Sequence, residues 1–339
     1  MTIGILYESK EWSTYALRDH IAKGVSVKLF DLQEEVDEAG LLSCKLILNR
    51  VFASAVFRGH QKALEQMPGV IALLEKHAIP MINPAEAHFY ETSKSRSKEA
   101  LVAHGFPVPA LYCKFDPAPD PDGLCIFTEA AKKPKAAEKP GTAETTGKPA
   151  LSDKQEPEYH CVVNPDCGDA GDAAECLTGE PEYPCIVKPD CGGRTNCTFI
   201  VNNGKELRES LAGAPDAVFL AEEYIRPVKG FVTRLEIIGG VIKLALKRGV
   251  TENGLSAYRL GSKYEFYNDL PSRIGDTAIR AMECLRVEAG SMDIIENAEG
   301  FYIIDVNSVS NASEDNTRMF NFDLMAETAA YALKRYSLL

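Results

Sequence analysis

Two patterns of apolar and polar residues alternate along the first 92 residues. Short apolar runs, which are typical of strands, lie at Ile3–Tyr7, Val25–Phe30, Leu46–Val51 and Ile79–Ile82. Stretches with helical patterning lie at Trp12–Ala22, Gly59–His77 and Pro84–Tyr90. Strands that alternate with helices predict an α/β fold class, with a mostly parallel sheet in an N-terminal domain at residues 1–92.

A second region, predicted as a central lobe at residues 93–225, begins with a helix over Lys94–His104 that Gly105 and Pro107 end. The composition then changes. Between Glu129 and Glu158 the only large apolar residue is Leu151. Such a segment cannot bury enough apolar surface to offset the entropy of ordering it. We therefore predict a disordered insertion at about residues 116–181, with a docking tail as the alternative.

Regular patterning resumes near Tyr183 and continues to the end of the chain. Strands are predicted at Cys185–Lys188, Thr198–Val201, Val218–Glu222, Phe231–Ile238, Val241–Lys247, Ala289–Ile295 and Phe301–Val306. Helices are predicted at Asp269–Leu285 and Phe322–Tyr336, the second from apolar residues at helical spacing. These elements predict a C-terminal lobe at residues 226–339.

One segment occurs twice. Residues 158–169 recur 24 positions later as residues 182–193, with eight of twelve positions identical. A single repeat is too few for a solenoid, so a tandem duplication is the simplest account. The second copy has Lys188 where the first has Asn164, and only the second leads into a glycine-containing loop. The six cysteines from Cys161 to Cys197 lack the short spacing that zinc sites prefer.

Charge and hydropathy restrict the partners. The chain has 339 residues, with 37 basic and 49 acidic ones and a net charge of −12. This balance argues against nucleic acid or an anionic membrane, although a local basic cleft for phosphate remains compatible with it. No stretch approaches the ~20 apolar residues of a membrane span. The first residues resemble a strand rather than a signal peptide, so we expect a cytoplasmic protein whose cysteines are mostly thiols. The oligomeric state is left open, with a homo-oligomer as one alternative.

Candidate nucleotide-binding groups follow the second copy of the repeat. Lys188 ends an apolar strand, and Gly192 and Gly193 open a loop whose backbone N–H groups can approach phosphate. A strand-end lysine alone is more often simply solvated. Further on, the segment from Glu222 to Ile225 combines carboxylates with free backbone groups at a strand end, which can pair with an adenine edge.

Oxygen ligands lie at the ends of two later strands. Asp293 is in the first, and Asp305 and Asn307 are two positions apart in the second, so they point to the same side of it. Mg²⁺ prefers such ligands together with phosphate oxygens and water. Taken alone, an Asp-x-Asn pair more often marks a transition from strand to turn.

The ordered series of these motifs resembles the ATP-grasp superfamily. More narrowly, it is similar to the branch that contains ribosomal-protein glutamate ligases, lysine-biosynthesis carrier ligases and glutathione synthetase. The resemblance covers nearly the whole chain apart from residues 116–181. It implies an ATP-grasp fold behind an N-terminal α/β domain. The site residues it implies are Lys94, Lys188, Gly192, Gly193, Glu222, Glu223, Tyr224 and Ile225 for ATP, Arg234 and Arg248 for catalysis, and Asp293, Asp305 and Asn307 for Mg²⁺ or, alternatively, Mn²⁺.

Three positions depart from the family pattern. Val232 stands where relatives have an aspartate that holds ribose, so Glu223 or another acid substitutes or the contact is lost. Thr195 and Cys197 replace later glycines of the loop, which makes the loop stiffer or positions an unusual phosphate contact. Near Arg259 the asparagine of the substrate signature is missing, so the identity of the substrate does not transfer.

The resemblance implies an enzyme that joins a small-molecule or peptide carboxylate to an amine through an acyl-phosphate, with an amino acid as one substrate. The cationic side chains and the metal would neutralise the charge on the transferring phosphoryl group. Two alternatives remain open: an ATP-grasp kinase that stops after phosphorylation, and a non-catalytic nucleotide-binding protein with this fold.

Overall fold

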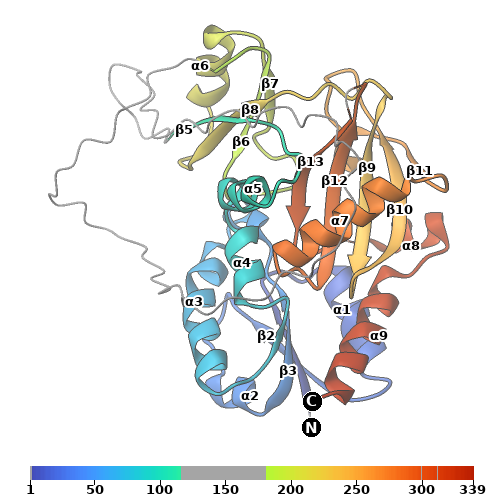
Figure 1. Cartoon of the computed structure of the whole chain (residues 1–339). Helices are drawn as coiled ribbons and strands as arrows, with labels where there is room; N and C mark the ends of the chain where they lie inside the picture. Colours follow the sequence, from blue (N-terminus) through green and yellow to red (C-terminus); the bar gives the residue numbers. More distant parts are fainter. Residues whose placement is uncertain (1, 116–180, 299, 311) are drawn as a thin grey trace, which may run out of the picture.

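The computed structural model describes residues 2–115, 181–298, 300–310 and 312–339. The predicted insertion, apart from its last residue, and the first copy of the repeat therefore lie outside the described residues. Within the described ranges the chain forms three sheets with helices packed on them (Figure 1). In this part of the chain, every helix is too short or too polar to traverse a lipid bilayer.

The N-terminal sheet is parallel, as the alternating pattern predicted. Its strands follow the order β2 (Ser26–Asp31), β1 (Thr2–Tyr7), β3 (Cys44–Arg50) and β4 (Met81–Ile82). One face packs against α1 (Trp12–Ile21) and the C-terminal helix α9 (Leu324–Ser337), which lie side by side in Figure 1. The other face packs against α2 (Glu38–Leu42) and α3 (Gln61–Lys76). The last helix of the chain therefore packs on the first sheet.

The central sheet is antiparallel and smaller. Its strands follow the order β5 (Leu111–Phe115), β8 (Phe219–Glu223), β6 (Cys185–Pro189) and β7 (Phe199–Val201). Helix α6 (Gly204–Ala212) packs on it through Leu207 and Leu211, which join Phe115 and Phe219 in one core. The strand that carries Lys188 is therefore an inner strand of this sheet.

The C-terminal sheet has five antiparallel strands. Their order is β11 (Tyr264–Phe266), β10 (Val241–Gly249), β9 (Phe231–Ile238), β12 (Ala289–Glu296) and β13 (Phe301–Asn307). Helix α7 (Ser272–Cys284) covers one face, where Leu235, Met292 and Ile294 are buried. Because side chains alternate along a strand, the residues between these point to the opposite face.

The remaining helices connect the sheets. They are the 3₁₀ helix η1 (Ala53–Arg58), α4 (Ala85–Glu91), α5 (Lys94–Ala103), the 3₁₀ helix η2 (Tyr258–Leu260) and α8 (Glu314–Phe320). Hydrophobic patterning did not predict seven of the observed elements, namely α2, η1, β5, α6, η2, β11 and α8. Most of them are too short to show a period of their own, because three to seven residues cover at most two helical turns. The predicted domain limits at residues 92 and 225 stay a prediction.

Candidate active site

A row of charged side chains crosses the face of the C-terminal sheet that α7 leaves uncovered. Asp293 on β12 pairs with Arg234 on β9 at one side and with Asp305 on β13 at the other. Directly opposite residues point to the same face, with their Cβ atoms about 5 Å apart. One step along, Ser291 pairs with Asn307. The register therefore brings together the three residues that the sequence predicted as metal ligands.

Both carboxylates of the row are paired with cations. Asp293 lies 3.2 Å from Nη1 of Arg234 and 2.7 Å from Nη2 of Arg248. Asp305 accepts a hydrogen bond of 2.8 Å from Nζ of Lys94. Burial alone raises the pKa of Asp305, but the charges of Lys94 and Lys188 and the hydrogen bonds from Lys94 and Asn307 together hold the pKa well below its usual range. Asp305 is therefore ionised at neutral pH.

A second charged cluster joins the central lobe to the row. Glu222 on β8 is almost completely buried and lies 2.6 Å from Nζ of Lys188 on β6. Its other oxygen lies 2.8 Å from Nζ of Lys98 on α5, a contact close enough for an ion pair although its angles do not meet those of a hydrogen bond. Lys188 also donates to the carbonyl of Ile304, next to Asp305, at 3.0 Å. Both predicted lysines, Lys94 and Lys188, thus lie beside the end of β13 that carries Asp305 and Asn307.

The sequence did not predict Lys98 as a site residue. It lies four positions after Lys94, so the two lysines occupy the same face of α5 one turn apart. Burial lowers the pKa of Lys98 to about 8, even though Glu222 opposes this shift. Burial alone raises the pKa of Glu222, but the two lysines together hold it below its usual value.

Asp190 fixes the lysines relative to one another. It follows β6, and its carboxylate accepts hydrogen bonds of 2.8 Å from the backbone N–H of Ser95 and 2.9 Å from the hydroxyl of Ser93. The backbone N–H of Lys94 donates to the Asp190 carbonyl at 3.0 Å. A carboxylate at the start of α5 is favourable because the free N–H groups and the helix dipole lie there. Asp190 therefore connects the strand of Lys188 to the helix of Lys94.

The predicted adenine segment lies beside an apolar cluster. Ile225 packs with Val232 and Ile295, and all three are buried. Val232, which replaces the expected ribose-binding aspartate, therefore belongs to an apolar surface. The side chain of Glu223 accepts a hydrogen bond of 3.2 Å from the backbone N–H of Ala110. Tyr224 follows the end of β8 and is half-buried.

The glycine-containing loop after β6 rests on η1. Position 192 requires glycine because a Cβ atom there would lie 2.7 Å from the ring of Phe57. Gly193 follows it, next to Ser54. Arg194 forms an ion pair with Glu11, and the thiol of Cys191 contacts the carbonyl of Ala53. These contacts hold the loop against the N-terminal domain.

Two residues replace expected glycines in that loop. Thr195 and Cys197 have φ angles of 59° and 48°, in the left-handed region that glycine favours. For a residue with a side chain this conformation costs about 1–2 kcal/mol. The backbone of the loop therefore keeps a glycine-like path although the glycines are missing.

An ATP-grasp domain model matches residues 158–313, a range that contains both charged clusters except for α5. The chain therefore contains an ATP-grasp domain. No curated protein matches the chain.

Solved structures share the ATP-grasp fold with the chain over its whole length. The ATP-grasp ligase PsnB, complexed with a minimal precursor, Mg and ADP, aligns with a TM-score of 0.57 at 15% identity, over 99% of this chain and 98% of that one. A RimK-domain ATP-grasp protein from Sphaerobacter thermophilus gives 0.59 at 14% identity, over 98% and 99%. D-alanine–D-alanine ligase from Bacillus anthracis gives 0.59 at 15%, over 99% of both chains. The predicted fold is thereby confirmed.

The predicted metal ligands of this ATP-grasp chain fit an ion that arrives with phosphates. Among the described residues, no group of three His, Cys, Asp or Glu side chains could hold a metal ion. The row supplies two carboxylates and one amide, Asp293, Asp305 and Asn307. Mg²⁺ commonly binds one or two carboxylates and completes its shell with substrate phosphates and water. The donor set is therefore suited to Mg²⁺ with a nucleotide and not to a metal held by protein alone.

Proposed function

We propose that the protein is an ADP-forming, ATP-dependent ligase that joins a carboxylate to an amine, with an amino acid as one substrate. One observation carries the proposal. The carboxylate row of the C-terminal sheet faces lysines from α5 and from the central sheet, and two arginines flank it. Phosphoryl transfer is catalysed mainly by positioning and by neutralising charge, and this arrangement provides both.

The residues divide into three groups by chemistry. Ile225, Val232 and Ile295 offer an apolar surface for the base. Lys94, Lys98 and Lys188 supply positive charge for the phosphates. Asp293, Asp305 and Asn307 would hold Mg²⁺, which when bound would clamp phosphate oxygens and neutralise their charge.

The ion pairs of the site also support this division. Lys94 is paired with Asp305, and Lys98 and Lys188 with Glu222, so each lysine has a carboxylate partner. A nucleotide phosphate can take the place of a carboxylate at a lysine, because both are anionic oxygen acceptors. Asp305 would then be free to bind the metal.

In the proposed reaction, a carboxylate oxygen of the acid attacks the γ-phosphorus of ATP, and the bond from that phosphorus to ADP breaks. The amine in its neutral form attacks the acyl carbon, phosphate leaves with the electrons of the acyl C–O bond, and the nitrogen releases a proton to solvent. Arg234 and Arg248 lie beside Asp293 at the edge of the row and would stabilise the negative charge on the transferring phosphoryl group. An amide or peptide bond results.

Named relatives support the class of reaction. PsnB is described as a ligase complexed with Mg and ADP, and D-alanine–D-alanine ligase joins amino acids by its name. Both share the fold at 15% identity, so the substrate of this chain remains to be found by experiment. The need for ATP fits a cytoplasmic location.

The direct test is trapping of the acyl-phosphate. Purified protein is incubated with Mg-ATP, hydroxylamine as the amine, and a panel of amino acids and small carboxylic acids; ADP, phosphate and hydroxamate are then measured. ADP release that requires both acid and amine supports the ligase. ADP release without an amine would indicate the kinase, and ATP binding without turnover a non-catalytic binding protein.

A matched pair of variants belongs to this test. Asp305→Asn keeps the size of the side chain but removes a proposed metal ligand, so ADP formation should be abolished while the protein stays folded. Asp269→Asn makes the same change at a highly exposed site and should leave ADP formation unchanged. Equal activity of the two variants would refute the metal assignment.

A further inference from the structure

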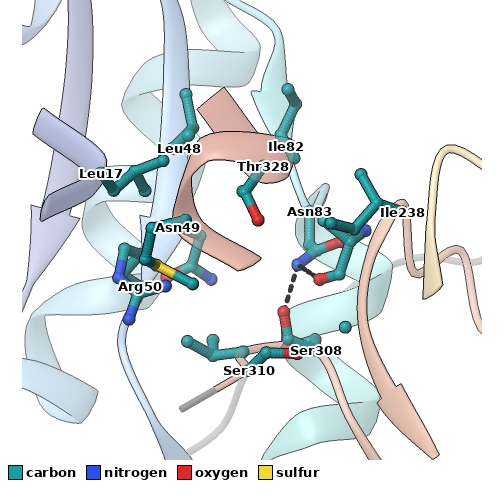
Figure 2. A pocket seen from close by; sticks show the side chains of 14 residues that line it. Leu17, Leu48, Asn49, Arg50, Ile82, Asn83, Ile238, Ser308, Ser310 and Thr328 are labelled. Atoms are coloured by element: carbon teal, nitrogen blue, oxygen red, sulfur yellow. Dashed lines mark hydrogen bonds between the residues drawn. The ribbon is translucent and has the colours of Figure 1, made fainter. Parts of the chain in front are cut away.

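A pocket lies between the N-terminal sheet and the C-terminal lobe. Its walls come from the ends of β3 and β4, the start of β12, the segment after β13, and α9 (Figure 2). The empty space amounts to about 370 Å³ when the part open to solvent is included. The enclosed part has room for about one or two water molecules, which is also the size of a carboxylate group.

Arg50, at the end of β3, is the charged residue that lines this pocket. It is 4% exposed, and it donates to the hydroxyls of Ser13 at 2.8 Å and Thr14 at 3.4 Å. Both partners are neutral, and no ion pair joins Arg50 to any described residue. Guanidinium has five N–H donors, so three remain without a partner in the described part of the chain. A buried charge is costly unless it is paired. The carboxylates of Glu8 and Glu11 act on Arg50 only from beyond ion-pair distance, so its free donors point to an anionic ligand.

The hydroxyl of Ser308 is a second, independent indication. It is buried on the pocket wall and has no hydrogen-bond partner among the described residues. The backbone of Ser308 is held on both sides: its N–H donates to Glu91 at 2.6 Å, and its carbonyl accepts from Asn83 (Figure 2). Buried polar atoms nearly always have a partner, so this fixed hydroxyl is available to a ligand.

The pocket adjoins the charged row. Ser308 directly follows Asn307, and Gly290 directly precedes Ser291, the residue opposite Asn307. Ser310, also on the pocket wall, donates to Glu236 at 2.5 Å, and Glu236 accepts from Arg234 at 2.9 Å. A ligand in the pocket therefore lies close to the place where the proposed phosphoryl transfer occurs.

We propose that this pocket binds the non-reacting carboxylate of a small acid substrate, with Arg50 as its ion-pair partner and Ser308 as a hydrogen-bond donor. This inference rests on the proposed ligase function and deepens it. Leu17, Leu48, Ile82 and Met325 form the apolar part of the wall, which suits a short aliphatic chain. The substrate class is therefore a small amino acid or short dicarboxylate, and the pocket is too small for a nucleotide.

Calorimetric titration of the full chain tests this without turnover. The protein is first saturated with Mg-AMPPNP, so that the nucleotide site is occupied, and is then titrated with the common amino acids, succinate, glutarate and, as an uncharged counterpart, succinamide. We expect at least one acid to bind and succinamide not to bind. If AMPPNP binds but no acid does, the inference is wrong.

Variants then assign the contact. Arg50→Gln should weaken binding of that acid by about 30-fold or more, since breaking a buried charge pair typically costs that much or more. Arg50→Lys, which keeps the charge, should recover part of the affinity. Ser308→Ala should weaken binding about tenfold or more, as expected for one hydrogen bond to a charged group. The control Arg335→Gln removes an arginine that pairs with Glu288 outside the pocket and should change nothing.

Two readouts separate this role from a structural one. Ser308→Ala should retain the AMPPNP affinity and the melting temperature of the wild type. In turnover assays, Arg50→Gln and Ser308→Ala should both raise the KM of the acid and leave the KM of ATP constant. If Arg50→Gln and Ser308→Ala bind the acid as wild type does, the pocket assignment is wrong. If the wild-type protein does not bind AMPPNP at all, the proposed ligase function is wrong. Titration with the acids in the absence of nucleotide then tests whether the pocket binds a carboxylate.

Discussion

Replacing Glu222 by Gln tests the buried lysine–glutamate cluster. The change keeps the shape of the side chain and removes the carboxylate that lies 2.6 Å from Lys188 and 2.8 Å from Lys98. Glu222 is 1% exposed and the lysines 8% and 5%, so water cannot replace the lost charge. Breaking a buried ion pair by removing one partner typically costs about 3–5 kcal/mol.

Two features place the expected loss near the lower end of that range. Lys188 keeps its hydrogen bond to the carbonyl of Ile304. Lys98 already has a pKa lowered to about 8 by burial, so it can release its proton at modest cost when Glu222 is gone. We therefore expect a loss of about 3 kcal/mol in the free energy of unfolding, which lowers the melting temperature of a chain of this size by roughly 4 °C.

The assay is thermal unfolding at pH 7 and pH 9. The folded pKa of Lys98 lies below its unfolded value of 10.5, so between these two values the unfolded state binds more protons and stability rises with pH. The defect of Glu222→Gln should accordingly shrink at pH 9. Mg-AMPPNP should raise the melting temperature of the variant more than that of wild type, because phosphate supplies the missing negative charge.

Two further variants make the result decisive. Glu223→Gln changes the neighbouring carboxylate. A glutamine oxygen can also accept the hydrogen bond from the Ala110 N–H, so this change should cost under about 1 kcal/mol of stability. Adding Lys98→Met to Glu222→Gln should restore part of the stability. Wild-type melting of Glu222→Gln, an equal loss in Glu223→Gln, or no recovery in the double variant would refute the reasoning.

Three further outcomes are expected. Lys188→Ala should lower ADP formation about a hundredfold or more, whereas Asn164→Ala, the equivalent position in the first copy of the repeat, should do little; equal effects would contradict the assignment of Lys188. Burial lowers the pKa of His88 to about 4 from 6.5, so the unfolded state binds more protons between these values, and stability should fall from pH 6.5 to pH 4. His88→Gln should flatten this dependence in thermal unfolding, and an unchanged slope would exclude His88. Deleting residues 129–158 should leave the melting temperature and ATP affinity nearly unchanged, since loop length costs only ~0.6 kcal/mol per doubling; a large drop would show that the segment packs.

Local patterns in the sequence were sufficient for the N-terminal sheet and for singling out several candidate site residues. Strand and helix alternation predicted the parallel N-terminal sheet, because each element there buries an apolar face with its own period. The spacing of Asp305 and Asn307 placed both on one side of a strand, because side chains two positions apart in a strand point to the same face. Lys188 could be singled out because its copy of the repeat leads into the glycine-containing loop.

The pairing of distant residues required the tertiary structure. That Asp293 faces Asp305 depends on the register of antiparallel strands, which local periodicity does not specify. Lys98 meets Glu222, more than 120 positions later, only because α5 packs against the central sheet. Arg50 looked like an ordinary residue at a strand end, and its significance comes from burial beside Ser308, a property of packing between the first sheet and the C-terminal lobe. Such contacts join elements far apart in sequence, and their energy depends on desolvation, which the order of residues along the chain does not reveal.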